Sequence, residues 1–189
     1  MRLFTHMLFN ALTSSPERIG KNSEKLVGRA LKVFSDKHDL DYLLISDFSF
    51  ASPSTGEINQ IDHIYINKSG IFIIEVKNWK GYISSSLDNP VWCISARYSG
   101  KVYKTYPVNP IIQNVHHKEY ISELIKDKNI PIYDVAVFVS NNVERDKYEN
   151  VIWYKDLFRY LEDKTKEDLL SNEEIISIGG LLTPYKLER

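Results

Sequence analysis

The segment QIDHIYINKSGIFIIEVK, residues 60–77, constrains the fold more than any other part of the chain. Its two halves are rich in Ile, Val, Phe and Tyr and flank the turn-forming residues 67–70, a pattern typical of two antiparallel strands. The pattern predicts strands over residues 58–67 and 70–77, with Lys68-Ser69 as the loop. An Asp, a Glu and a Lys lie within this apolar hairpin, where an unpaired buried charge is costly.

The spacing of the charges predicts that they meet on one face. Side chains alternate along a strand, so a two-residue loop would place Asp62 opposite Glu75 and Gln60 opposite Lys77. Opposed Cβ atoms are about 4.5–5.5 Å apart, and like charges there are destabilising. A divalent cation removes this penalty, since Mg²⁺ usually takes one or two carboxylates together with water and phosphate oxygens. The hairpin therefore predicts a metal site with Lys77 beside it.

Two alternatives to the metal site follow from the same residues. A type I turn with a Gly bulge would shift the register by one and turn Glu75 away from Asp62. In the second alternative, Asp62, Glu75 and Lys77 form a salt-bridge ladder on a solvated sheet face. His63 alternates to the opposite face, where a packed or surface role is favoured over that of a base.

The remaining patterns predict one α/β fold. Asn22 and Ser23 are candidate caps of a helix over 23–37, and Asn109-Pro110 begins one over 110–127. The other expected elements are strands at 41–48, 132–140 and 151–154, a second hairpin at 81–86 and 90–97, and helices at 155–163 and 171–178. This order predicts a sandwich with a central mixed sheet.

Glu24 is the third candidate acid. It precedes Val27 by three residues and Leu31 by seven, which places it on the helix stripe that should face the sheet. The alternative is that Glu24 lies in the first helical turn and interacts with the helix dipole from solvent.

Composition limits the class of protein. With 189 residues, 43% of them hydrophobic, the chain suits one globular domain. The single cysteine, Cys93, excludes an internal disulfide and fits a reducing compartment, so we expect a cytoplasmic protein. No run approaches the roughly 18 apolar residues of a membrane span. Motifs of P-loop, serine-hydrolase and dinucleotide sites are absent from the sequence.

The charge distribution indicates where phosphate would bind. The net charge is −1, but residues 76–117 carry five Lys or Arg and one acid. Aromatic residues interleave with these cations, a mixture that can stack bases and contact phosphates, or equally fill cross-strand pairs. On the helix after them, His117 follows Gln113 by four residues, and partial burial is favoured over a phosphate contact.

Several ordered motifs resemble the nuclease-related domain (NERD) of the restriction-endonuclease-like PD-(D/E)xK superfamily. They cover about residues 20–140: Ser23-Glu24, Gln60-Ile61-Asp62, Glu75-Val76-Lys77, Gly81, Trp92 and Asn109-Pro110-Ile111-Ile112-Gln113. One departure is Ser23, since the family often has Gly before the acid. The resemblance implies a restriction-endonuclease-like three-layer sandwich with an inserted β-hairpin. The domain division we expect is an N-terminal arm (1–20), a nuclease-related domain (21–163) and a C-terminal helical extension (164–189).

The resemblance also implies a function, a metal-dependent endonuclease acting on DNA or, secondarily, RNA. Glu24, Asp62 and Glu75 would be ligands of Mg²⁺ or Mn²⁺, Lys77 would orient or activate water, and Gln60 would line the pocket. Substrate contacts are assigned to the side chains Gln113, Lys80, Arg97, Lys101 and Lys104. The rival function is a non-catalytic nucleic-acid-binding or adaptor module with the same fold.

The first 20 residues add an expectation about partners. Leu3, Phe4, Met7, Leu8 and Phe9 would be exposed apolar residues in the arm, which suits contact with a partner or with a second copy of the chain. We therefore expect nucleic acid as the main partner, a homodimer as a further candidate, and no membrane.

Overall fold

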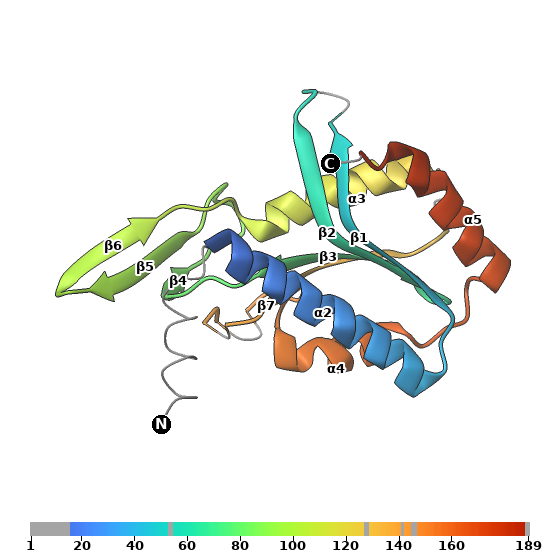
Figure 1. Ribbon diagram of the computed structural model, residues 1–189, viewed down its shortest axis with the longest axis horizontal. Coiled ribbons are helices and arrows are strands. Elements are labelled where there is room, and N and C mark those ends of the chain that lie inside the picture. Colours follow the sequence, from blue (N-terminus) through green and yellow to red (C-terminus); the bar gives the residue numbers. More distant parts are fainter. Residues whose placement is uncertain (1–15, 53–54, 127–128, 141, 145–146, 188–189) are drawn as a thin grey trace.

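The computed structural model describes residues 16–52, 55–126, 129–140, 142–144 and 147–187. The apolar residues 3–9 of the expected arm lie outside this part of the chain. The helices, labelled as in Figure 1, are α2 (Pro16–His38), α3 (Pro110–Ile125), α4 (Leu157–Lys164) and α5 (Asn172–Leu182), with short 3₁₀ turns η1 (Tyr154–Asp156) and η2 (Thr183–Tyr185). The strands are β1 (Tyr42–Ala51), β2 (Ile58–Asn67), β3 (Gly70–Lys77), β4 (Tyr82–Ser84), β5 (Cys93–Tyr98), β6 (Lys101–Thr105), β7 (Ile132–Phe138) and β8 (Val151–Trp153).

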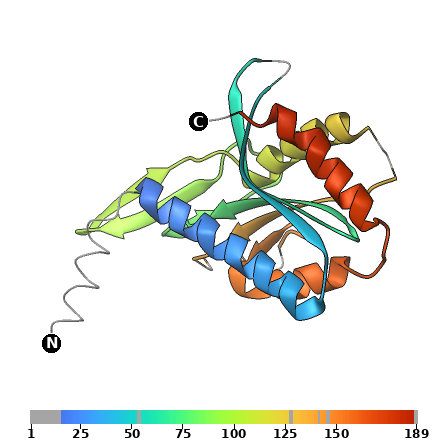
Figure 2. The same cartoon turned by 45° about the vertical axis from the view of Figure 1, so that its right-hand side comes forward.

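Five strands form a central mixed sheet in the order β1-β2-β3-β7-β8. Strands β1, β2 and β3 pair antiparallel, whereas β3, β7 and β8 pair parallel. The helices cover both faces, with α2 and α4 on one side and α3 and α5 on the other (Figures 1 and 2). The predicted three-layer α/β sandwich is therefore confirmed.

Each face of the sheet has its own hydrophobic core. On the α2 side, Val27, Leu31 and Phe34 pack against Phe72 and Ile74 of β3. The opposite core joins further β2 and β3 residues to α3 and α5: Ile64, Ile66, Ile71, Ile73, Ile121, Ile125, Ile175, Ile178 and Leu182. Because β3 is buried on both faces, its sequence is a nearly continuous apolar run.

Helix α2 begins earlier than the sequence predicted. It starts at Pro16, a residue tolerated in the first helical turn, so Asn22 and Ser23 are not its caps. The Ser23 hydroxyl instead donates to the Ile19 carbonyl oxygen, 2.9 Å away, a bond available to serine inside a helix. The assignment of the caps was wrong because local propensity does not distinguish a cap from an internal serine. None of the helices in the described residues is long and apolar enough to cross a membrane.

The β2–β3 hairpin has the predicted two-residue loop. Its register pairs Asn67 with Gly70 and continues to His63 opposite Ile74, which excludes the shifted register of a Gly-bulge turn. The Asn67 side chain accepts from the Ser69 backbone N–H at 2.9 Å and so stabilises the turn locally. The pairing ends one position before the expected Asp62–Glu75 pair.

A small antiparallel sheet, β4-β5-β6, is inserted between β3 and α3. Pairing of β4 with β5 confirms the predicted second hairpin, but β6 was missed because all five of its residues are exposed and give no core-facing pattern. We call β5–β6, residues 93–105, the ribbon. It projects away from the sandwich in Figure 1, while Trp92 at its base stacks on Phe138 of β7.

Asn109 connects the ribbon insertion to α3. Its side-chain oxygen accepts from the Ile111 N–H at 2.9 Å, which confirms the predicted cap. Its amide nitrogen donates to three backbone carbonyl oxygens, those of Ser86, Leu87 and Asn89. The start of α3, and thus the position of Gln113 one turn later, is fixed by these bonds.

Candidate functional site

Asp62 lies where β2 separates from β3. Ile61 and Ile64 both belong to the core on the α3 side, so strict alternation is broken between them, and Asp62 lines a groove on the α2 side. Its Oδ2 accepts from the Val76 backbone N–H at 2.7 Å, taking the place of a strand carbonyl. Burial, followed by the nearby Glu75 carboxylate, raises the pKa of Asp62 to about 8.

Glu75 is 4% exposed, and its two carboxylate oxygens differ in their hydrogen bonding. Its Oε1 accepts from Lys77 Nζ at 2.5 Å. Its Oε2 lies 4.0 Å from His117 Nδ1, and neither of these two buried atoms has a hydrogen-bond partner. A buried carboxylate oxygen without a partner is costly, so this arrangement favours a ligand that Glu75 could bind.

The Lys77 ammonium is held on several sides. Besides Glu75, it donates to Gln113 Oε1 of α3 at 3.2 Å, and it lies 5.6 Å from the centre of the Trp79 ring. An ammonium has three donors, so the two hydrogen bonds leave one N–H available to a phosphate or water oxygen. The structure thus brings together Lys77, Glu75 and Gln113.

Glu24 faces the sheet from the middle of α2. Because the helix begins at Pro16, Glu24 is not in the first turn, and the helix-dipole alternative loses its basis. Partial burial, then Asp47 and Glu75, raise the pKa of Glu24. Since Glu75 and Glu24 also raise the pKa of Asp62, the three acids act on one another electrostatically.

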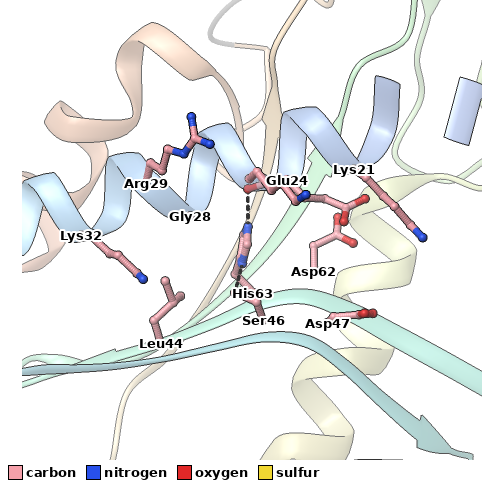
Figure 3. Close-up of a pocket in the computed structure, with 11 residues that line it drawn as sticks. Lys21, Glu24, Gly28, Arg29, Lys32, Leu44, Ser46, Asp47, Asp62 and His63 are labelled. Atoms are coloured by element: carbon pink, nitrogen blue, oxygen red, sulfur yellow. Dashed lines mark hydrogen bonds between the residues drawn. The ribbon is translucent and has the colours of Figure 1, made fainter. Parts of the chain in front are cut away.

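His63 fixes the turn of α2 that carries Glu24. Its Nε2 lies 2.8 Å from the Glu24 carbonyl oxygen and its Nδ1 lies 2.9 Å from Ser46 Oγ (Figure 3). A carbonyl only accepts, so Nε2 carries the proton and Nδ1 accepts from serine in the neutral ring. Burial lowers the pKa of His63. His63 is therefore a packed histidine, as expected, and it joins α2 to the edge of the sheet.

His117 is more deeply buried than the sequence predicted, and Asn114 is a buried neighbour of the site that the sequence did not predict. His117 is 2% exposed rather than partly buried, and burial together with Lys77 lowers its pKa to about 4. Asn114, one turn before it on α3, is also buried, and neither polar atom of its side chain has a hydrogen-bond partner. The available signal was the three-residue spacing of Asn114 and His117, which places the two side chains on one face of α3.

The other predicted site residues lie on β2, before β4 and on the ribbon. Gln60 is half-buried on β2 and pairs with Ser49 of β1, and its expected pairing with Lys77 lies beyond the β2–β3 register. The remaining cations are all exposed, one before β4 and three on the ribbon: Lys80, Arg97, Lys101 and Lys104.

The donor set fits a hydrated hard cation. The described residues contain no group of three His, Cys, Asp or Glu side chains already arranged to hold a metal ion. However, Mg²⁺ usually takes only one or two carboxylates and keeps several waters. Glu75 Oε2 is buried without a hydrogen-bond partner, and burial followed by the Glu75 carboxylate raises the pKa of Asp62; a bound cation would offset both costs. Oxygen-only ligands suit Mg²⁺ or Mn²⁺.

Comparison with known proteins places the site within a described family. A family model for the nuclease-related domain (NERD) matches residues 19–139, a range that includes Glu24, Asp62, Glu75, Lys77 and Gln113. An uncharacterized protein of Bacillus anthracis is 31% identical over 166 residues, which cover 84% of this chain and 73% of that protein. No solved structure matches the chain.

Proposed function

Because the chain belongs to the nuclease-related domain family, we propose that it is a divalent-metal-dependent endonuclease that hydrolyses DNA, with RNA as a secondary substrate. The observation that carries the proposal is the burial of Asp62 and Glu75 near each other, with Lys77 Nζ 2.5 Å from Glu75. Buried like charges destabilise a fold unless something compensates them, so their arrangement favours a site that acts on a charged substrate.

Glu24, Asp62 and Glu75 would hold Mg²⁺ or Mn²⁺. When bound, the cation makes water a stronger nucleophile and offsets negative charge on the phosphate. Lys77 orients the attacking water and donates a hydrogen bond to the scissile phosphate through its third N–H. Gln113 restrains Lys77 through the 3.2 Å hydrogen bond between them. Water adds to phosphorus and releases a proton to solvent, the phosphodiester P–O bond breaks, and the leaving oxygen takes a proton from solvent.

The exposed cations would bind the substrate away from the reacting phosphate. Lys80 and the ribbon residues Arg97, Lys101 and Lys104 carry no ion pair in the described part of the chain, and their positive charge favours contact with phosphates.

The test is cleavage of supercoiled plasmid, single-stranded DNA and RNA with Mg²⁺ or Mn²⁺, with and without EDTA. Asp62→Asn and Lys77→Ala should each reduce the rate by about 100- to 1000-fold, the usual cost of losing one preorganised electrostatic group. Lys155→Ala, an exposed lysine outside the site, is the matched control. Cleavage that persists in EDTA, or a Lys77→Ala variant as active as the control, would remove this mechanism.

A second candidate function is a non-catalytic nucleic-acid-binding or adaptor module. It is favoured by one observation, that Lys77 already neutralises Glu75 without a metal. Calorimetric titration with Mn²⁺ separates the two functions. Metal binding without cleavage of any of the three substrates supports the module. If the folded protein binds no Mn²⁺, the charged cluster has a structural role.

A further inference from the structure

A groove of about 500 Å³ lies between α2 and β1, next to the acidic cluster (Figure 3). One end is lined by carboxylates from three different elements, those of Glu24, Asp47 and Asp62. Cations of α2 also line the groove: Lys21, Lys25, Arg29 and Lys32. Lys21 lies near the acids, whereas Arg29 and Lys32 lie farther along α2 (Figure 3). Negative charge therefore gathers at one end of the groove, and positive charge extends along α2 away from it.

The three cations form a stripe on α2. Spacings of four and three residues place Lys25, Arg29 and Lys32 on neighbouring positions of one helix face. All three are exposed, and within the described part of the chain none of them forms a hydrogen bond or an ion pair. Lys21, which also lines the groove, differs because it pairs with Glu17 at 3.3 Å. We call Lys25, Arg29 and Lys32 the α2 track.

The α2 track is held in a fixed position relative to the acids. The opposite side of the helix is buried in the core through Val27, Leu31 and Phe34. Gly28 allows the His63 ring to pack directly against the helix, since a Cβ there would be 3.1 Å from His63 Cε1. Side chains presented by such a rigid element can position a ligand without large ordering costs.

We infer that the α2 track binds the phosphodiester backbone of a nucleic acid whose next phosphate reaches Glu24 and Asp62. The seven helical steps from Lys25 to Lys32 rise about 10 Å along the helix, a length that holds about three phosphates of one strand of a duplex, at about 3.4 Å of rise along the duplex axis for each phosphate. A chain of regularly spaced anions matches three unpaired cations, whereas the carboxylate end would repel it without a divalent cation. The inference rests on the proposed function, and it assigns binding to residues distinct from the ribbon.

The test compares two triple variants of the full chain. Lys25→Ala/Arg29→Ala/Lys32→Ala removes the track, and Lys155→Ala/Arg159→Ala/Lys166→Ala removes three exposed positive charges elsewhere. Binding of labelled single-stranded and duplex DNA is measured by fluorescence anisotropy in EDTA over a range of salt concentrations. Each phosphate contact contributes about 0.7 to the slope of log K against log salt for single strands and about 0.9 for duplex.

The track variant should lose about 2 from this slope with single strands or about 2.7 with duplex, and the control should lose little. Whether the loss appears with single-stranded or with duplex DNA shows which of the two the α2 track binds. A track variant that binds like wild type, or an equal loss in both variants, overturns the inference. Binding in EDTA and cleavage with metal are separate measurements, so the two proposals can fail separately. If binding depends on the α2 track but the protein does not cleave DNA with Mg²⁺ or Mn²⁺, the nuclease proposal alone is refuted. If the protein cleaves DNA but the track variant binds like wild type, the inference alone is refuted.

Discussion

Asp62 and Glu75 are 8% and 4% exposed, whereas every residue of β6 on the ribbon is exposed. The buried acids are costly, and each is held by a named partner, Val76 or Lys77. The ribbon cations remain in solvent, where charge costs little. A buried charge indicates a functional site because the fold must compensate the cost of burying it. An exposed charge has no such cost, so a role in binding DNA has to be shown by a binding measurement.

The largest expected effect is on stability, at the base of the ribbon. This base is as buried as the acidic site, so the contrast between a buried site and an exposed ribbon does not hold there. Trp92 is fully buried, stacks on Phe138, and donates from Nε1 to the Ser86 carbonyl oxygen at 2.9 Å. Trp92→Ala should lower the free energy of unfolding by about 3–5 kcal/mol, measured by urea denaturation. Tyr98→Ala, at the exposed tip, should change it by about 0.5 kcal/mol or less. Equal losses in both variants would show that the whole ribbon is part of the core.

The next effect concerns Asp62 and pH. Its pKa is raised from 3.8 to about 8, so between these values the folded state binds more protons than the unfolded state, and its contribution to stability falls as pH rises. In EDTA, Asp62→Asn removes the carboxylate and should be more stable than wild type by about 1–3 kcal/mol at pH 8, since each pKa unit is worth about 1.4 kcal/mol. Thermal melts should show this advantage shrinking toward pH 5. An advantage that is constant with pH would contradict the raised pKa.

A smaller effect tests the contact between α2 and the sheet. Gly28→Ala adds a methyl group that meets His63, whereas Gly180→Ala on α5 meets no atom within 4 Å. Alanine favours a helix over glycine by about 1 kcal/mol, so Gly180→Ala should stabilise by about that amount. Gly28→Ala should gain less because the His63 ring must move. Denaturation of both variants measures the difference, and an equal gain would mean that His63 does not restrain α2.

The smallest expected effect is on the ribbon itself. Arg97→Ala/Lys101→Ala/Lys104→Ala removes three exposed cations and should change the free energy of unfolding by about 0.5 kcal/mol or less. The same variant should also lose affinity for DNA relative to wild type. This loss should be larger at low salt than at high salt, because salt screens the contribution of exposed charges. Anisotropy titrations at two salt concentrations measure this. A large loss of stability would instead assign these residues a structural role.

The sequence predicted best what depends on local pattern. The β2–β3 register follows from alternation and a two-residue loop, and the start of α3 follows from Asn109-Pro110. The position of Asp62 was predicted only in part. Its bond to Val76 replaces the expected pairing with Glu75, because β2 departs from β3 at that point.

Other features depend on contacts between distant segments. The burial of His117 and Asn114 requires α3 to lie over Glu75, which no local spacing specifies. The α2 track has the composition of an ordinary solvated helix face until β1 forms the second wall of the groove. Strand β6 has no buried residue at all. Sequence reasoning fails where a side chain's environment is supplied by tertiary structure.

The parallel pairing of β3 with β7 has a consequence for the order of folding. The β2–β3 hairpin closes over a two-residue loop, whereas the pairing of Ile71 with Ile132 closes a loop that contains the ribbon and α3. Loop closure of that length costs more entropy and slows formation. The half of the site carried by Asp62, Glu75 and Lys77 should therefore form before Gln113 and His117 dock on it. In pulsed hydrogen exchange, β2 and β3 amides should gain protection earlier than those of β7, and the reverse order would contradict this sequence of events.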